Sequence, residues 1–323
     1  NPGMNFNSNG QPFSSFMNNE QQNHTNPKVS IIVPVYNVEK YIKKCASSLF
    51  EQTYPNIEYI FVNDASTDNS LDTLKHIAKN NLHQHITIVE NKHNSGSSAT
   101  RNNAINIATG EYITFCDSDD WVEPTAIEEM VNTMISHNAD IVITPFYTNT
   151  FNQEKILNFE DADIANLNKI PLNFLHFSLC NKLIKAHLIK DNQSLPNVDC
   201  WEDLSVISRI YALDPKVVLL NKPFYHYRKY EHHSLTSNSH ERQLNDRLIY
   251  TDFIVDWFTT HNLHTKYAQF LNHLKFTAKI KMLRTTPRQY RRWKQTYPEA
   301  NKHIMSYTDI PLHYRLAFFI ANL

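Results

Sequence analysis

The clearest chemical signal in this sequence is the acidic cluster Asp117-Ser118-Asp119-Asp120. It directly follows residues 112–115, whose apolar character predicts a buried strand. Carboxylates spaced Asp-x-Asp in a tight turn can converge on one divalent cation. Mg²⁺ or Mn²⁺ bound in this way keeps positions open for the oxygens of a diphosphate. The same residue types are common in turns, so an ordinary turn remains an equal alternative when the cluster is taken alone.

Strand and helix signals alternate from Lys28 to Phe146 and must position these acids. Short β-branched or apolar runs predict strands at 29–33, 57–62, 86–89, 112–116 and 141–143. The predicted helices are one capped by Asn37, one starting at Asp68 or Asn69, one over 99–108 that ends at Gly110 as a left-handed cap, and one from Pro124 to about residue 138. This alternation predicts an α/β fold with a doubly wound, mostly parallel sheet and helices on both faces.

Polar segments follow the first four predicted strands, where a parallel sheet binds its ligands. These segments are residues 34–37, 63–68, 93–96 and 117–120. We expect all four to line one crevice, which favours a binding site over four unrelated turns. Gly96, between serines before a helix, suits either close approach to a ligand or a plain turn. The absence of Gly-x-Gly-x-x-Gly and Gly-Lys-Ser/Thr motifs argues against a dinucleotide site and a P-loop.

Composition sets the outer limits. The chain of 323 residues can form one large domain with an extension, or two domains. Its net charge of −1 gives no indication of a nucleic-acid partner. Residues 261–323, however, contain 11 Lys and Arg against 2 Asp and Glu, a local charge of +9. Such a basic tail either faces an anionic partner such as a membrane surface or is an ordinary solvated helical face.

The cysteines and apolar runs favour a cytoplasmic protein. Cys45, Cys116, Cys180 and Cys200 lack metal-binding spacing, so we expect a reducing compartment and no disulfides, with Cys45 and Cys116 as small core residues. No apolar run approaches the roughly 18 residues of a membrane span, and no signal peptide is visible. Residues 1–26 are rich in Asn, Gln and Ser, which predicts a flexible tail.

Four motifs together resemble the family 2 glycosyltransferases with the GT-A fold. They are residues 29–37, 62–68, 96–102 and 110–121, in the family's order and spacing, with a weaker match to about Ser234. One departure is Asn63-Asp64-Ala65 where the family usually has Asp-Asp-Gly, which puts the turn geometry at Ala65 in question. The resemblance implies a GT-A catalytic domain over 27–235, with a nucleotide-binding half over about 27–146 and an acceptor half over about 147–235. A basic helical extension would follow over 236–323.

The resemblance also implies roles for individual residues. Pro34, Tyr36 and Asn37 would line the nucleotide pocket, Asp64 would bind the uracil edge, Arg101 would close the pocket, Asp117 would lie near ribose and metal, and Asp119 would bind Mn²⁺ or Mg²⁺. Structural alternatives are a turn cap for Asp64, a surface ion pair for Arg101 and simple packing for Tyr36.

A second acidic pair, Glu202-Asp203, precedes a helical pattern. Acids there favour the positive end of a helix dipole, which is a structural explanation. The pair also resembles the family's Glu-Asp motif, which implies that Asp203 is the general base for the acceptor hydroxyl. Glu202 would orient the acceptor or stay structural. Direct attack opposite the leaving diphosphate would invert the anomeric carbon.

A third segment is Pro223 to Arg228, which predicts a strand that the resemblance places over the donor diphosphate. His226 would then be a further metal ligand, Arg228 would neutralise phosphate, and Ser234 would hydrogen-bond it.

The expected function is therefore transfer of a hexose or N-acetylhexosamine from a UDP-sugar to a saccharide or lipid-linked saccharide, in the synthesis of capsule, lipopolysaccharide or a related polymer. The C-terminal extension would pack on the catalytic domain, contact the inner face of the cytoplasmic membrane or form a homo-oligomer. One alternative is a sugar-nucleotide pyrophosphorylase, although the chain lacks a Gly-rich basic loop before Tyr36. The other is a non-catalytic nucleotide- or glycan-binding module.

Overall fold

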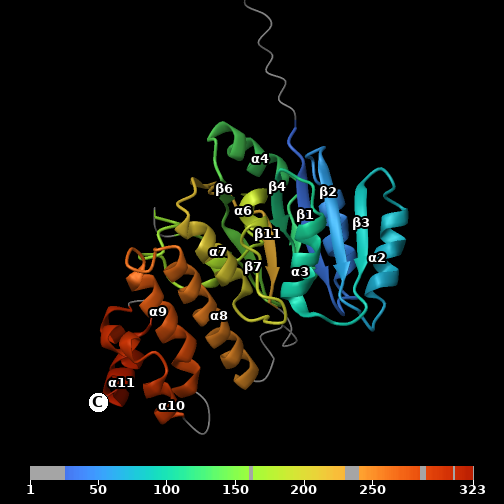
Figure 1. The fold of residues 1–323 in the computed structure, drawn as a ribbon. Helices are drawn as coiled ribbons and strands as arrows, with labels where there is room; N and C mark the ends of the chain where they lie inside the picture. The colour runs from blue at the N-terminus through green and yellow to red at the C-terminus, as the bar shows by residue number, and fades with distance from the viewer. Residues whose placement is uncertain (1–25, 160–162, 230–239, 284–288, 308–309, 323) are drawn as a thin grey trace, which may run out of the picture.

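The computed structural model describes residues 26–159, 163–229, 240–283, 289–307 and 310–322. Two sheets and their helices form the part of the molecule up to Arg228, and a helical C-terminal region packs beside them (Figure 1). The predicted N-terminal tail lies outside the described residues except for Asn26.

The described residues form a central sheet of seven strands, in the order β10-β6-β9-β4-β1-β2-β3. The strands are β1 (Val29–Val35), β2 (Ile57–Asn63), β3 (His85–Glu90), β4 (Tyr112–Phe115), β6 (Ile141–Ile143), β9 (Lys182–Lys185) and β10 (Val217–Leu219). All are parallel to one another except β9, which is antiparallel to both β4 and β6. All five predicted strands are present, and the prediction of a mostly parallel sheet is confirmed.

Strand β1 lies at the centre of this sheet, and its composition explains why. Residues 29–33 are all buried, as expected for a parallel strand covered on both faces. Ile31 packs in one core with helices α1 (Ile42–Phe50) and α4 (Ala126–Ser136). Its neighbour Ile32 packs in a second core with α3 (Gly96–Ile107) and α7 (Glu202–Ala212). Successive side chains thus enter opposite cores, so the sheet is doubly wound.

Two local predictions were wrong. Asn37 does not cap α1, because the helix starts at Ile42 and Tyr41 occupies its N-cap. The Asn37 backbone has a φ of +50°, and its side-chain oxygen accepts a hydrogen bond from the backbone N–H of Thr67 at 2.8 Å. It therefore connects the segments after β1 and β2.

Gly110 is not a left-handed helix cap, since α3 ends at Ile107 and Ala108 is extended. Instead, Gly110 allows two backbones to approach closely. A Cβ at this position would lie 2.5 Å from the Ser30 hydroxyl oxygen, which accepts the Gly110 N–H at 2.9 Å. The helix predicted to start at Asp68 or Asn69 is α2 (Ser70–Lys79), with Asn69 at its N-cap, as predicted.

A second sheet brings the segment from Pro223 to Arg228 beside the acidic cluster. In the described chain its strand order is β5-β11-β7-β8. The strands are β5 (Trp121–Val122), β7 (Phe146–Asn149), β8 (Glu154–Leu157) and β11 (Tyr225–Arg228). The short helices α5 (Phe174–Phe177) and α6 (Ala186–Lys190) flank β9 along the chain. The predicted strand near residues 223–228 is therefore β11, which pairs with β5 directly after residues 117–120.

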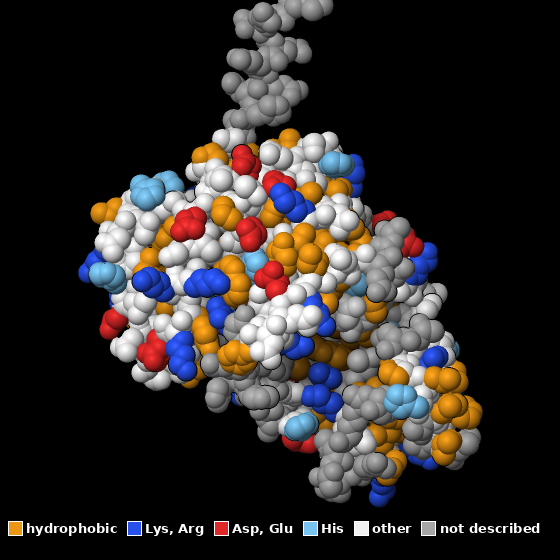
Figure 2. Space-filling view, turned by 180° about the vertical axis from the view of Figure 1, so that it is seen from behind, with side chains coloured by type: hydrophobic (Ala, Val, Ile, Leu, Met, Phe, Trp, Pro, Cys, Tyr) orange, Lys and Arg blue, Asp and Glu red, His pale blue; other side chains and the backbone are white. Residues whose placement is uncertain are grey.

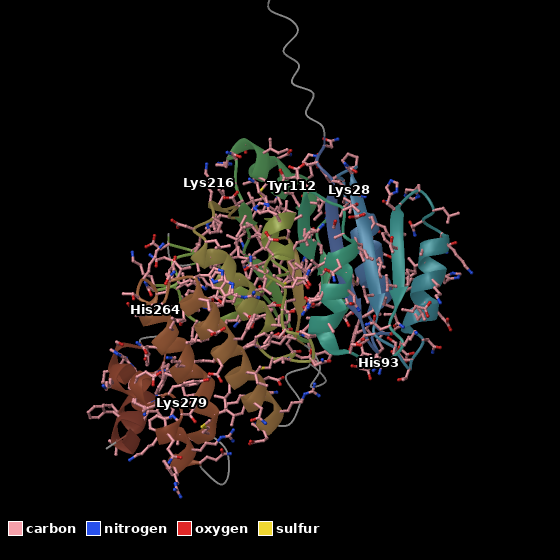
Figure 3. All side chains as sticks on the ribbon, in the orientation of Figure 1. Lys28, His93, Tyr112, Lys216, His264 and Lys279 are labelled. Carbon is pink, nitrogen blue, oxygen red and sulfur yellow. The ribbon has the colours of Figure 1, made fainter. Side chains whose placement is uncertain are left out.

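The C-terminal region is helical, as predicted. It contains α8 (His240–Thr260), α9 (Ala268–Lys279), the 3₁₀ helix η3 (Ile280–Leu283), α10 (Tyr290–Gln295), the 3₁₀ helix η4 (Pro298–Ser306) and α11 (Leu312–Asn322). Lys279 lies among these helices, and its ammonium donates to the carbonyls of Trp293, Thr296 and Tyr297 at 3.2, 2.5 and 3.1 Å (Figure 3). Part of the predicted basic face therefore points into this region's own core.

Apolar side chains also lie on the surface of this region, where orange atoms gather in Figure 2. Those on α11 are Leu312, Leu316, Phe319 and Ile320. Within the part of the chain that the structure describes, none of the helices has the length and hydropathy needed to cross a membrane.

Candidate active site

At the carboxyl edge of the sheet, β1 extends further than its neighbour β4. β4 pairs with β1 only as far as Ile32, whereas β1 continues beside β2 to Val35. Pro34 therefore removes no hydrogen bond from the β4 ladder, which explains how a proline fits a central strand. His93, after β3, marks this end of the sheet in Figure 3, and Lys28 and Tyr112 mark the opposite end.

Asp64 fixes the segment before α3. Its buried carboxylate accepts hydrogen bonds from the backbone N–H groups of Ser95 and Gly96, both at 2.9 Å, and from the Asn91 amide at 2.8 Å. Gly96 has a φ of +82°, and a Cβ there would lie 2.5 Å from the carboxylate of Asp199. Asp64 thus caps the backbone before α3, not the turn that directly follows it. Its contact with a uracil edge stays a prediction.

Arg101 connects the two acidic clusters. From α3 its guanidinium donates to Asp117 Oδ1 at 2.8 Å and to Glu202 Oε1 at 3.0 Å, and it lies 3.8 Å from Asp203 Oδ1. Its side chain is only 9% exposed, so it is not a surface ion pair. Burial opposes its positive charge, but the carboxylates of Asp117, Asp203 and Glu202 raise the pKa of Arg101 well above its ordinary value. A buried cation therefore holds acids from distant segments together.

The third acid of the cluster, Asp120, is structural. Its buried carboxylate accepts the Tyr225 hydroxyl proton and the Arg228 backbone N–H, both at 2.6 Å. The Tyr225 oxygen in turn accepts the Asp117 N–H at 3.1 Å. Sequence reasoning missed this anchor, and the one available signal was the tyrosine in the predicted strand. Asp120 attaches the loop to β11, so the Asp117 and Asp119 side chains are held beside each other.

Asp117 and Asp119 form an electrostatically unfavourable pair. Burial and the charge of Asp117 raise the pKa of Asp119 to about 6, while Arg228 lowers it. A divalent cation would relieve this repulsion, so the residues fit a metal. The described residues contain no group of three or more His, Cys, Asp and Glu side chains arranged for a metal. Asp117 and Asp119 would supply carboxylates to such a cation, which leaves other positions for phosphate oxygens.

His226 has other partners. Its ring stacks between Trp121 and Tyr147, at centroid distances of 4.8 and 4.4 Å. Its Nε2 lies 2.7 Å from a Glu123 oxygen, and its Nδ1 lies 3.3 Å from a Glu154 oxygen. Both nitrogens thus face glutamates rather than the Asp117–Asp119 pair. These contacts do not involve Asp117 or Asp119, and the metal-binding role of His226 stays a prediction.

Arg228 lies beside the acidic cluster. Its Nε donates to the Asp119 carbonyl at 2.6 Å, and its guanidinium lies over the rings of Tyr41 and Trp121 at 4.6 and 5.0 Å. A role in neutralising phosphate stays a prediction for this residue. Ser234, predicted to act with it, lies outside the described residues.

Glu202 and Asp203 differ in their hydrogen bonds. Glu202 Oε1 accepts from Arg101 and, at 3.2 Å, from the Ser97 hydroxyl. Asp203 Oδ2 accepts from the Leu179 N–H at 3.1 Å, but Oδ1 has no donor among the described residues. Burial raises the pKa of Asp203, and Arg101 lowers it. Glu202 therefore accepts from two side chains, whereas Asp203 accepts from one backbone N–H and its Oδ1 is buried beside Arg101.

The predicted nucleotide side is more open. Tyr36 is 44% exposed and Asn37 is also exposed, while Pro34 is half-buried. Exposure of this extent disfavours the alternative in which Tyr36 simply packs in the core. Contact of these three residues with a nucleotide stays a prediction.

The matched region decides the family. The profile of the family described as Glycosyl transferase family 2 matches residues 30–191, half of the chain. The chain belongs to glycosyl transferase family 2. Among curated relatives, the glycosyltransferase GlyA of Streptococcus pneumoniae is 35% identical over 62% of the chain and 30% of its own length. The minor teichoic acid biosynthesis protein GgaB of Bacillus subtilis is 30% identical over 87% of the chain and 32% of its own length. The chain thus spans about a third of the length of these two relatives.

A solved structure agrees with the fold. S. aureus TarS 1–349, crystallised with UDP-GlcNAc, superposes with a TM-score of 0.67 at 23% identity over 91% of this chain and 89% of that one. The predicted GT-A fold with a helical extension is thereby confirmed. Glu202, Asp203 and β11 of this family 2 chain lie beyond the matched residues 30–191, so their approach to Asp117 is a finding of the tertiary structure.

Proposed function

We propose that this family 2 chain is an inverting, metal-dependent glycosyltransferase that moves a sugar from a UDP-sugar to a hydroxyl of a surface-glycan acceptor. The observation that carries this proposal is the bridge at Arg101, which joins Asp117 to Glu202 and lies beside Asp203. A donor-side carboxylate and a candidate base thus share one buried cation.

On the donor side, Asp117 and Asp119 would hold Mn²⁺ or Mg²⁺. The bound cation would neutralise the charge that develops on the leaving diphosphate. Arg228, whose guanidinium is fixed beside Asp119, would add a second positive charge there. Tyr36 and Asn37 would contact the nucleotide, and Asp64 would keep the segment before α3 in place.

On the acceptor side, Asp203 would act as the general base. A sugar hydroxyl is a poor nucleophile, and the Asp203 carboxylate would take its proton as the new C–O bond forms. The bond from the anomeric carbon to the diphosphate oxygen breaks at the same time, and its electrons leave with UDP. Attack opposite the leaving group inverts the anomeric carbon. Glu202, held by Arg101 and Ser97, would fix the start of α7.

Two comparisons support the substrate class. The TarS structure contains UDP-GlcNAc, and GgaB is named for minor teichoic acid synthesis. We therefore propose a UDP-hexose or UDP-N-acetylhexosamine donor and a saccharide or polyol polymer, free or lipid-linked, as acceptor. With a lipid-linked acceptor, the exposed apolar side of α11 would be the membrane contact.

The test is a thermal-shift panel of nucleotide sugars with and without Mn²⁺, followed by measurement of UDP release from any donor that binds. A ligand that binds the native state raises the melting midpoint. We expect a UDP-sugar to do so only with the metal and then to be hydrolysed slowly. Equal UDP binding without metal would refute the metal assignment. Binding without any turnover in the presence of candidate acceptors would favour a non-catalytic module.

A further inference from the structure

A lysine is completely buried in the wall of the acceptor side. Lys182, the first residue of β9, has no exposed surface. Its ammonium donates to the Ser178 carbonyl at 2.5 Å and to Asn181 Oδ1 at 2.8 Å. Burial of an ammonium is costly even when it is hydrogen-bonded, and an apolar side chain of similar size is often at least as stable. Core packing alone therefore does not explain a lysine here.

Asn181 extends this buried group of polar side chains. Its amide nitrogen donates to the carbonyls of Thr144 and Leu175 at 2.9 and 3.1 Å. Its oxygen accepts from Lys182 and, at 3.0 Å, from the Ser178 hydroxyl. Residues 178–182 are thus attached to the end of β6 and to α5. These contacts hold the backbone of the turn in one conformation.

The same turn holds the candidate base. The N–H of Leu179, between Ser178 and Asn181, donates to Asp203 Oδ2, and the Leu179 carbonyl accepts the Lys182 N–H at 3.3 Å. Asp203 Oδ1 has no donor in the described parts of the chain. The position of one peptide group therefore helps to fix the orientation of the Asp203 carboxylate.

We propose that Lys182, acting with Asn181, is a positioning residue that fixes the Leu179 peptide and, through it, the orientation of the Asp203 carboxylate towards the acceptor hydroxyl. The inference rests on the proposed function, in which Asp203 is the base. Burial raises the pKa of Asp203 and so does Asp117, whereas Arg101, the Leu179 N–H and Lys182 lower it.

The test compares Lys182→Met with Lys185→Met. Met fills a similar volume without charge, so the melting temperature should be unchanged or higher. With UDP-GlcNAc, Mn²⁺ and water as acceptor, we expect kcat for UDP release to fall about 10- to 100-fold while KM stays within about 2-fold, because a small displacement of a reacting group is costly. Lys185, on the same strand, pairs with Asp140 at 2.8 Å and is partly exposed. Its variant should keep the wild-type kcat.

Two further measurements keep the proposal open to refutation. Lys182→Arg retains a cation and donors, and should restore part of the kcat lost in the Met variant. A crystal structure of Lys182→Met should show the 3.1 Å contact from Leu179 to Asp203 lost. An intact contact, or a kcat equal to that of Lys185→Met, would overturn the proposal. If Asp203→Asn keeps full turnover, the proposed base is wrong, and if wild type releases no UDP, the crystal structure still decides the positioning.

Discussion

Carboxylates at the two ends of the central sheet have opposite environments. At the amino end, burial would raise the pKa of Glu58, but hydrogen bonds from Lys28, Ser30 and Thr109 lower it to about 2. At the carboxyl end, burial and Asp117 raise the pKa of Asp119 to about 6. Figure 3 places Lys28 at the first end and His93 at the second. At the amino end, hydrogen bonds from the protein stabilise the carboxylate. At the carboxyl end, two carboxylates repel each other, and a bound cation can relieve that repulsion.

The largest expected effect comes from a site carboxylate that contributes to function rather than to stability. Asp203→Asn removes the proposed base with little change in shape. General bases contribute about 10²- to 10⁴-fold, so kcat should fall by that factor. UDP binding with Mn²⁺ should persist, as measured by thermal shift. Unchanged turnover would assign Asp203 a structural role and favour a binding module.

The next test removes the cation at the carboxyl end. Arg101→Met leaves the partly buried Asp117 and Glu202 without their shared partner. Removal of one partner from a buried ion pair costs about 3–5 kcal/mol, so the urea-unfolding free energy should fall by that amount at pH 7. Lys28→Met at the amino end is the control, because its side chain is 36% exposed and should cost about 1 kcal/mol or less. Equal losses of unfolding free energy in the two variants would contradict the difference between the two ends of the sheet.

Glu58→Gln tests the carboxylate at the amino end of the sheet through the pH dependence of stability. The folded pKa of about 2 lies below the ordinary value of 4.5, so the stabilisation is complete above pH 4.5 and disappears as pH falls towards 2. The shift corresponds to about 3 kcal/mol at most. We expect a loss of about 1–3 kcal/mol at pH 7, measured by urea unfolding, and a much smaller loss at pH 3. Glu90→Gln, at an exposed ion pair with Lys75, should change stability little at either pH.

Asp119→Asn should change the free energy of unfolding in the opposite direction. Because the folded pKa of about 6 lies above the ordinary value of 3.8, ionisation destabilises the metal-free protein fully above pH 6, and this penalty fades as pH falls from 6 towards 3.8. The variant should therefore be more stable than wild type by about 1–2 kcal/mol at pH 7 and equal near pH 4. Mn²⁺-dependent UDP binding should be lost. Destabilisation at pH 7 would show that Asp119 belongs with Glu58 as a structural carboxylate.

The nucleotide-binding half could be predicted well because its signals are local. Each predicted strand is a short apolar run, and the polar residues that follow it lie at its carboxyl end whatever the rest of the chain does. The errors at Asn37 and Gly110 have a different origin. The side-chain oxygen of Asn37 binds Thr67, and Gly110 packs on Ser30, so partners far along the chain overrode the local preferences.

The acceptor half could not be predicted in the same detail. β9 inserts between β4 and β6 although it lies far behind both in sequence, and a periodic pattern does not reveal its neighbours. No sequence motif indicates the hydrogen bond of Tyr225 to Asp120 or that of Leu179 to Asp203.

The sequence by itself determined the residue types: the acids at the end of a strand, the second acidic pair before a helix, and the strand–helix order that makes a parallel sheet. Only the tertiary structure decided what each acid does. Asp120 and Glu202 accept hydrogen bonds from Tyr225 and Arg101, whereas burial and Asp117 raise the pKa of Asp119, and Asp203 Oδ1 has no donor among the described residues. The physical reason is that the chemistry of a carboxylate depends on its neighbours in space, and Arg101 meets Glu202 across 101 positions of the chain.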